Sequence, residues 1–379
     1  DDYFAEYAYL CDMKILFIGD YSNLHSTLAR ELRRRGNTVT VLSDRCGCMD
    51  IDSDIYLQRG NYPGAGVTYL YRLVSLLPRL SGYDVVQLIN PHFFSLRPGK
   101  LRYFLRELRR ANGSVFLSLA GDDHFFVRAC LDRDTFRYSE FRIGYMPTEF
   151  SKMCPQHEHG YMLPSVQHYT EDLYAAIDGA MSVLPEYDMA ARPILGDKLA
   201  YTGLPIDLDE LTATPLPDTD KVRILVGMRS QYVTSKGTDH LLRIAREAAE
   251  KKPGLIEVEN VVDLPWTQYL DKIRSSHIVL DQLYSYSPAM NALDTMALGR
   301  VSGSGAQPEY YDMIGEKELR PIISLSPYEQ DIAGTLYALA ADRRRLEQMA
   351  ADGRKLVERH NDTRLVTDRY ERHWAKHLN

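Results

Sequence analysis

KILFIGDYSNLHSTLARELRRRGNTVTVLS, residues 14–43, contains two short apolar runs on either side of an amphipathic segment. Three leucines between positions 24 and 32 recur at helical spacing. Ser22 or Asn23 can cap the start of this helix, and Gly36 can close its end. A strand, a glycine turn, a helix and a second strand in this order predict a βαβ unit with a parallel sheet.

The same alternation continues through the first half of the chain. Further strands are expected at residues 84–89, 115–119, 179–184 and 198–203, with a helix at 97–111. Residues 124–175 are rich in aromatic residues and histidine and contain no long periodic segment, so we expect irregular structure there.

A second strand–glycine–helix unit begins at VRILVG, residues 222–227. Beyond it we expect strands at 255–260, 277–282 and 321–326, and helices at 239–252, 269–275 and 288–298. From Pro327 onward the pattern is helical and charged. The sequence therefore predicts an α/β protein with two Rossmann-like, doubly wound domains facing a cleft, where ligands bind at the carboxyl ends of the strands.

Three prolines and several acidic residues in 204–220 are typical of a linker. We expect an extension outside the fold (1–12), an N-terminal Rossmann-like domain (13–204), a linker (205–220), a C-terminal Rossmann-like domain (221–360) and a last helical segment (361–379) that packs back on the N-terminal domain.

The composition excludes several classes of protein. The formal net charge of -7 argues against a nucleic-acid partner. No apolar run approaches the ~18–20 residues that span a bilayer, and the first twelve residues lack the basic region of a secretory signal. Five scattered cysteines are typical of free thiols, and they are Cys11, Cys46, Cys48, Cys130 and Cys154. Metal binding by Cys46-Gly-Cys48 is the alternative, but a single Cys-x-Cys pair is a weak signal for it. We expect a cytoplasmic protein.

The most informative motif is SYSPAMNALDTMALG, residues 285–299. Ser287 is a favoured N-cap residue and Pro288 a favoured first helical residue. The free amides of a helix that begins at Pro288 and Ala289 form an anion site suited to a diphosphate. Asp294 would lie two turns along on the same face as Ser287. The alternative is an ordinary capped helix.

Two cations occupy the loop after the 222–227 strand. Arg229 directly follows the strand and Lys236 stands at a helix entry, so both can converge on a pyrophosphate. They would neutralise charge on a leaving diphosphate in place of a metal ion. The alternative is that both are solvated surface side chains.

The Lys-Gly pair at 236–237, followed by the helix that ends in MALG, resembles the group 1 glycosyltransferases, which are retaining enzymes of the GT-B fold. The resemblance extends over nearly the whole chain from Met13. It implies that Arg229 and Lys236 bind the donor phosphates. Of the family's two helix glutamates, the second matches Asp294, which would hold the ribose, and the first matches Tyr286, a departure because a phenol is not an anion.

The resemblance also assigns the N-terminal domain to the acceptor and the C-terminal domain to the donor. In SLAGDDHFF (118–126), Gly121 and Asp123 match the family's H-G-x-D pattern, while Ala120 replaces its histidine. Asp122 or Asp123 would orient the acceptor or the sugar, or else both simply cap a helix.

Three further segments are placed by the same resemblance. The loop of Gly19, Asp20 and Tyr21 would lie beside the acceptor and the donor phosphates, with His92 in the same cleft. Backbone groups of the strand end would hold the nucleotide base, and the residues concerned are Val262, Asp263 and Leu264.

No metal site is expected. His157, His159 and His168 lack an HExxH pattern or a carboxylate pair at ligand spacing. The alternating acids Asp50, Asp52 and Asp54 lie in a turn and are interpreted as solvated. We expect no cofactor other than a nucleotide-sugar donor substrate.

Cations are concentrated on the predicted helix 97–111, with Tyr103 and Phe104 beside them, and on Arg30 and 33–35 of the first helix. A weak peripheral contact with anionic lipid headgroups at the inner face of the membrane is one reading. The other is two amphipathic helices that pack their leucines on the sheet.

The resulting hypothesis is a metal-independent, retaining hexosyltransferase of polysaccharide biosynthesis. It would move a sugar from a nucleoside-diphosphate sugar to a saccharide or lipid-linked saccharide acceptor. The alternatives are a sugar-nucleotide epimerase of the same fold and a non-catalytic binding or scaffold protein with a degenerate donor site.

Overall fold

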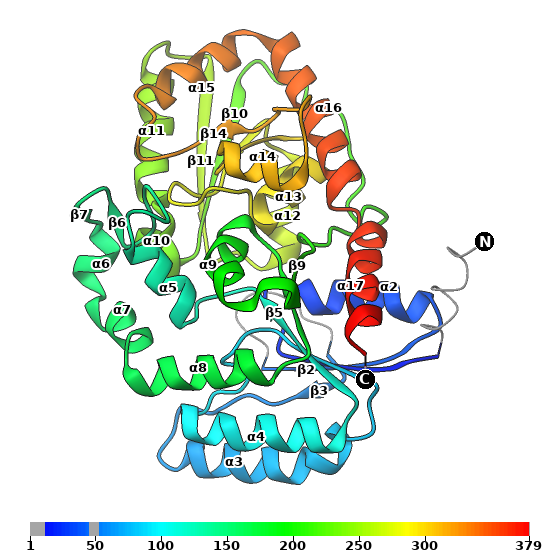
Figure 1. Cartoon of the computed structure of the whole chain (residues 1–379). Helices are drawn as coiled ribbons and strands as arrows, with labels where there is room; N and C mark the ends of the chain where they lie inside the picture. Colours follow the sequence, from blue (N-terminus) through cyan, green and yellow to red (C-terminus); the bar gives the residue numbers. More distant parts are fainter. Residues whose placement is uncertain (1–11, 45–52, 379) are drawn as a thin grey trace. The chain divides into compact units, whose positions relative to one another are not determined.

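The chain folds into two compact units in the computed structural model, which describes residues 12–44 and 53–378 (Figure 1). Unit 1 comprises 1–128, 159–205 and 363–379, and unit 2 comprises 129–158 and 206–362. The backbone thus passes between the units four times, once inside the expected linker. The proposed extension over 1–12 lies outside the described residues, except for Asp12.

Unit 1 contains a seven-stranded parallel sheet in the order β3-β2-β1-β4-β5-β8-β9. Its strands are β1 (Lys14–Ile18), β2 (Thr38–Ser43), β3 (Ile55–Tyr56), β4 (Val85–Leu88), β5 (Ser114–Leu119), β8 (Gly179–Ser182) and β9 (Leu199–Tyr201). From β1 the chain adds β2 and β3 on one side of the sheet, and from β4 it adds β5, β8 and β9 on the other side. The strand order therefore reverses between β1 and β4. In an open parallel sheet, a ligand-binding crevice lies at such a reversal.

The helices of unit 1 pack on both faces of this sheet. They are α2 (Leu24–Arg34), α3 (Ala65–Leu76), η2 (Leu77–Leu80), α4 (Pro98–Ala111), α5 (His124–Leu131), α7 (Pro155–Tyr161), α8 (Pro164–Ala176), α9 (Pro185–Leu195), η3 (Gly196–Lys198) and α17 (Thr363–His377), of which α5 and α7 cross a unit boundary. One apolar cluster joins α3, α4 and α8 to the strands. Arg35, after α2, bonds to Asp368 and Glu371 of α17 at 2.6 Å.

The expectation of irregular structure over 124–175 is wrong, because this segment includes α8. The buried residues of α8 have helical spacing; they are Val166, Tyr169, Thr170, Leu173 and Tyr174. Three of these five side chains are Thr or Tyr rather than aliphatic. The periodicity is therefore present but weak on a hydrophobicity scale, which is why the sequence pattern missed it.

Unit 2 contains a five-stranded parallel sheet in the order β11-β10-β12-β13-β14 and a small antiparallel pair, β6 with β7. The strands are β10 (Val222–Met228), β11 (Ile256–Val262), β12 (Ile278–Leu280), β13 (Val301–Ser304), β14 (Ile323–Ser324), β6 (Arg142–Ile143) and β7 (Met146–Pro147). The helices are α6 (Glu149–Met153), η4 (Ser230–Tyr232), α10 (Val233–Lys236), α11 (Thr238–Glu250), α12 (Trp266–Arg274), α13 (Met290–Ala297), α14 (Pro308–Ile314), α15 (Ile332–Ala341) and α16 (Arg343–His360).

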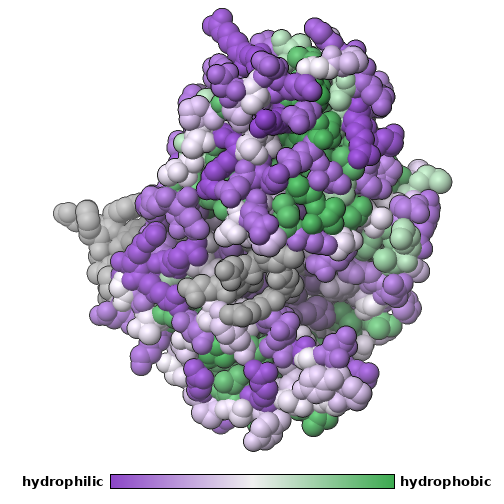
Figure 2. Space-filling view, turned by 180° about the vertical axis from the view of Figure 1, so that it is seen from behind, coloured by the Kyte–Doolittle hydropathy of each residue, from purple (hydrophilic) through white to green (hydrophobic). Residues whose placement is uncertain are grey.

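Two parallel, doubly wound sheets confirm the predicted fold class. Each unit has its own apolar core, built from strand residues and the inner faces of its helices. The outer surface in Figure 2 is mainly hydrophilic, with separate hydrophobic areas. In the described part of the chain, no helix is both long and apolar enough to cross a membrane.

Candidate functional site

The candidate site of unit 2 lies where the order of its sheet reverses. The chain moves from β10 to β11 on one side and to β12 on the other, so the reversal falls between β10 and β12. Arg229 directly follows β10 and Asp281 directly follows β12. Carboxyl ends at such a point are the usual ligand site of an open parallel sheet.

Lys236 is held at this point by Asp281. Its Nζ lies 3.3 Å from Asp281 Oδ1, which also accepts a hydrogen bond from Asn291 Nδ2 at 3.0 Å. Ser304 Oγ donates to the other carboxylate oxygen at 3.3 Å. Asp281 is buried whereas Lys236 is about one-third exposed, so Asp281 positions a cation that is still accessible to solvent.

Gly237 makes this approach possible. Its φ of +67° lies in the left-handed region, and a Cβ there would stand 3.1 Å from Leu283 Cβ. The Leu283 N–H donates to the Lys236 carbonyl at 2.8 Å. The Lys-Gly pair thus brings the end of α10 against the segment after β12, because glycine alone adopts this conformation without strain.

Arg229 presents a buried guanidinium nitrogen. Its Nη1 has no hydrogen-bond partner among the described residues. Burial raises the pKa of the Tyr269 phenol, the carboxylates of Asp281 and Asp294 raise it further, and Arg229 opposes them, so each of these three charged groups lies near Tyr269. A buried guanidinium nitrogen without a hydrogen-bond partner is unfavourable, which makes this position a candidate anion site.

The helix of the 285–299 motif starts later than predicted. Its N-cap is Ala289, not Ser287, and it begins at Met290, not Pro288. The Ser287 carbonyl accepts hydrogen bonds from Gln282 Nε2 (3.3 Å) and Ser285 Oγ (2.8 Å), so it does not begin the helical ladder. These contacts override the local Ser-Pro signal, and the side chain of Ser287 is fully buried.

Asp294 lies on α13 with its carboxyl buried. Burial raises the pKa of this carboxyl well above its ordinary value, and the negative charges of Glu210 and Asp281 act in the same direction. Because α13 begins at Met290, the argument that Asp294 shares a helix face with Ser287 no longer applies. Its proximity to Tyr269 nevertheless places it in the same neighbourhood as Arg229 and Asp281.

The end of β11 is tied to the Arg229 loop. The Asp263 N–H donates to the Met228 carbonyl, and Asp263 Oδ1 accepts from the Ser230 N–H, both at 3.0 Å. Val262 is half exposed, and Leu264 is partly buried. The segment proposed to hold a base therefore lies beside the segment proposed to hold phosphates.

Tyr286 points into the part of unit 2 formed by residues 129–158. Its Oη accepts a hydrogen bond from the Arg137 N–H at 2.6 Å, and its ring stacks on Tyr138 with centroids 4.7 Å apart. The Arg137 guanidinium lies over the same ring. These contacts are structural, so the position of Tyr286 does not support a contact with the donor.

In unit 1, the loop after β1 lies at the β1/β4 reversal. A Cβ on Gly19, whose φ is +84°, would overlap the Ile89 side chain at 2.2 Å. Asp20 is fully buried and accepts the N–H groups of His25 and Ser26, at 3.1 and 2.9 Å. Asp20, rather than Ser22 or the Asn23 side chain, therefore caps α2, and this structural role does not place it on an acceptor.

His25, the second residue of α2, is a polar residue beside this loop that the sequence did not single out. Its Nδ1 donates to the Gly19 carbonyl at 2.7 Å, and burial lowers the pKa of its imidazole to about 3. The neutral ring holds the glycine turn in place. Its position at the start of α2, five residues after Asp20, was the available signal.

Tyr21, Asn90 and Gly121 meet around the same reversal. A Cβ on Gly121 would lie 3.2 Å from the Tyr21 ring and 3.3 Å from Asn90 Nδ2. Asn90 Nδ2 also donates to the Asp122 carbonyl at 3.1 Å, and its Oδ1 accepts the His92 N–H. Burial lowers the pKa of His92, with the Asp122 charge opposing. The predicted residues of the acceptor domain are thus neighbours.

Asp123 is the N-terminal cap of α5. Its Oδ1 accepts the Phe126 N–H at 2.8 Å and its Oδ2 accepts the Tyr174 hydroxyl. It is buried, and burial raises the pKa of its carboxyl. The helix-cap alternative describes Asp123 better than a contact with sugar, which leaves Asp122 as the more accessible of the two acids.

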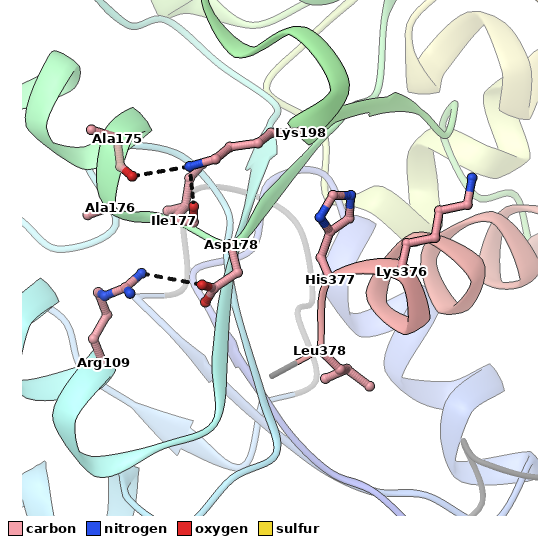
Figure 3. A pocket seen from close by; sticks show the side chains of 9 residues that line it. All are labelled: Arg109, Ala175, Ala176, Ile177, Asp178, Lys198, Lys376, His377 and Leu378. Carbon is pink, nitrogen blue, oxygen red and sulfur yellow. Dashed lines mark hydrogen bonds and ion pairs between the residues drawn. The ribbon is translucent and has the colours of Figure 1, made fainter.

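A separate cavity of about 360 Å³ lies at the opposite edge of the unit 1 sheet (Figure 3). It is lined by Asp178 and Lys198, which precede β8 and β9, and by Arg109. Lys198 Nζ donates to the Ala175 and Ile177 carbonyls, and Arg109 pairs with Asp178 at 3.7 Å. These groups already have partners, and the cavity is remote from the strand ends that carry the predicted residues.

In the ranges 12–44 and 53–378, no group of three or more His, Cys, Asp or Glu side chains is arranged to hold a metal ion. Cys130 and Cys154 are free thiols. Cys11, Cys46, Cys48, Asp50 and Asp52 lie outside the described residues.

Comparisons with known proteins bear on the fold. No protein-family model and no curated protein matches this sequence. Sucrose-phosphate synthase from Thermosynechococcus elongatus matches with a TM-score of 0.63 at 12% identity, over 96% of this chain and 98% of that chain. Anabaena HepE in complex with UDP and glucose gives 0.60 at 12% identity, over 95% and 98%.

A TarM variant from S. aureus, in a complex that contains UDP, gives a TM-score of 0.54 at 10% identity, over 81% of this chain and 59% of that chain. At such identities the matches establish the architecture. The chain has the GT-B fold, and the resemblance seen in the sequence is confirmed at that level.

Proposed function

We propose that this protein transfers a hexose-type sugar from a nucleoside-diphosphate donor to a saccharide or lipid-linked saccharide, with retention at the anomeric carbon. The observation that supports this most directly is the buried, unpartnered Nη1 of Arg229 beside the Lys236–Asp281 pair. A diphosphate would accept charge-assisted hydrogen bonds from this nitrogen and from the Lys236 ammonium, which is still accessible to solvent.

In this proposal Arg229, Lys236 and the free amides at the start of α13 stabilise the leaving diphosphate. Asp294 contacts the ribose, and the backbone at 262–264 contacts the base. The bond from the anomeric carbon to the phosphate oxygen breaks while the acceptor hydroxyl oxygen bonds to that carbon, and the hydroxyl proton leaves with the nucleoside diphosphate. Asp122, His92 and Tyr21 remain the predicted residues of the acceptor side.

The test is calorimetric titration of the full chain with UDP, GDP and ADP in the presence of EDTA. UDP is tried first because a structural neighbour was solved with UDP-glucose. We expect one nucleotide to bind, and Arg229→Ala and Lys236→Ala each to weaken binding by about 10–150-fold, since hydrogen bonds to charged groups contribute about 1.5–3 kcal/mol. Arg246→Ala, an exposed arginine on α11, is the matched control and should bind normally.

Four other results of these experiments would each contradict one part of the proposal. Absence of binding to all three nucleotides would favour a scaffold protein. Normal binding by both variants would refute the phosphate site, and binding that requires a divalent cation would refute metal independence. Exchange of isotope within a nucleotide-sugar in the absence of any acceptor would favour the epimerase.

A further inference from the structure

Helix α3 carries an apolar stripe on the side that faces solvent. Val67, Tyr71 and Val74 stand at positions i, i+4 and i+7, with exposed fractions of 75%, 75% and 47%. The other side of the helix buries Tyr69 and Leu73 on the sheet. Because the exposed side of a surface helix is normally polar, this stripe needs an explanation.

Two more exposed aromatic residues extend the stripe. Tyr62 precedes α3, and Tyr103 lies on α4 with the Arg106 guanidinium 5.5 Å from its ring centroid. The two helices cover the same face of the unit 1 sheet (Figure 1), and the Ser95 N–H, in the segment before α4, donates to Tyr69 Oη of α3 at 3.2 Å. We call Tyr62, Val67, Tyr71, Val74 and Tyr103 the α3–α4 face.

The α3–α4 face lies in the most basic part of the chain. Residues 57–112 contain nine Arg and Lys against two acids, although the protein as a whole has a net charge of -7. Among the described residues, no ion pair is found for five of these cations: Arg59, Arg72, Arg79, Arg97 and Lys100. An apolar stripe in a segment rich in cations without ion pairs is complementary to an anionic surface with an apolar interior.

Helix α2, the other basic helix of the sequence, does not share this character. Arg33 pairs with Asp54, and Arg35 pairs with Asp368 and Glu371, all at 2.6 Å. Arg34 pairs with Glu31. These ion pairs hold the arginines within unit 1. We therefore do not assign a lipid contact to α2, which the sequence analysis had considered together with the 97–111 helix.

We propose that the α3–α4 face docks on the surface of a lipid bilayer that contains anionic lipids. Valine side chains would enter the boundary of the acyl chains, tyrosines would lie at the level of the headgroups, and the unpaired arginines would contact lipid phosphates. The inference rests on unit 1 alone and does not depend on the donor chemistry proposed for unit 2.

The test is sedimentation of the full chain with vesicles of phosphatidylcholine, with and without phosphatidylglycerol. We expect binding only to the anionic vesicles, and a loss of binding on adding salt because exposed charges are screened. The variant Val67→Ser/Tyr71→Ser/Val74→Ser should bind at least about tenfold more weakly, since burial of apolar area scales with binding strength. Arg79→Glu/Lys100→Glu should weaken binding to a similar degree.

The matched control is Tyr145→Ser/Met146→Ser, which removes two apolar residues of the β6–β7 hairpin of unit 2 that are also well exposed, at 85% and 67%. It should bind as the unaltered protein does, and circular dichroism should show all variants folded. Unchanged binding by the α3 variant, or no binding of the unaltered protein, overturns the proposal. So does self-association without lipid that the α3 variant abolishes, because the face would then belong to a second copy.

Discussion

Lys236 Nζ lies 3.3 Å from Asp281 Oδ1, although the two residues are 45 positions apart in the chain. The pair forms because β10 and β12 are neighbours in the sheet and both end at the same edge. Asp281 receives three side-chain hydrogen bonds, from Lys236, Asn291 and Ser304. It therefore fixes where the cation points and stabilises the loop that carries it.

Asp281→Ala should lower the free energy of unfolding by about 1–3 kcal/mol, because the substitution removes a buried acceptor, leaves the Asn291 and Ser304 donors unsatisfied and breaks an ion pair with a partly exposed lysine. Urea unfolding measures this change. Asp271→Ala is the matched control, since Asp271 is exposed on α12 and pairs only with Arg274. A loss below about 1 kcal/mol, the range of exposed ion pairs, would contradict the role assigned to Asp281.

Arg229→Met should separate stability from binding. The substitution removes a buried nitrogen that has no partner, so the free energy of unfolding should stay constant or rise by about 1 kcal/mol. Nucleotide affinity should nevertheless fall by about 10–150-fold. Urea unfolding and calorimetric titration of the same preparation test both quantities. If stability falls and affinity does not, Arg229 has a structural role and the anion site lies elsewhere.

The fold was predictable where local pattern and tertiary structure agree. Residues 14–43 form β1, α2 and β2 as expected, because leucine spacing and flanking glycines fix these elements within one stretch of chain. Helix α3 was not predicted, since apolar residues also occur on its exposed side and blur the amphipathic pattern. The proximity of Arg229 and Lys236 to Asp281 depends on strand order, which spacing in the sequence does not specify.

Local signals failed where distant groups compete for the same atoms. Ser287 and Pro288 are favoured residues at a helix start, yet Gln282 Nε2 donates a hydrogen bond to the Ser287 carbonyl and the helix begins at Met290. Asp20 shows the converse case, because a carboxylate read as part of a ligand site instead caps α2. In both cases the outcome depends on which backbone groups need a partner after folding.

Asp294→Asn should change how stability depends on pH. Burial, together with the charges of Glu210 and Asp281, raises the pKa of this carboxyl above its ordinary value. Between the unfolded and folded pKa the native state holds the extra proton, so stability falls as pH rises through that window. Asparagine removes this penalty, and the variant should be more stable than the unaltered protein at pH 8, by about 1.4 kcal/mol for each unit of the shift.

Urea unfolding between pH 4 and pH 8 checks this prediction. The two proteins should converge near the ordinary pKa of aspartate and diverge above it. Parallel curves over the whole range would show that Asp294 is ionised as readily in the folded protein as in the unfolded chain. Asp312→Asn, which replaces an exposed acid on α14, serves as the comparison and should leave the profile unchanged.

Tyr286→Phe separates a structural role from a donor-binding role. The phenol oxygen accepts the Arg137 N–H, and the ring remains stacked on Tyr138 if only the hydroxyl is removed. Loss of that acceptor should lower the free energy of unfolding by about 1–3 kcal/mol, because the Arg137 N–H is left unsatisfied. Nucleotide affinity should stay within about twofold, since the hydroxyl bonds to the backbone of Arg137. If affinity falls while stability holds, the hydroxyl contacts the donor and the contact with Arg137 is secondary.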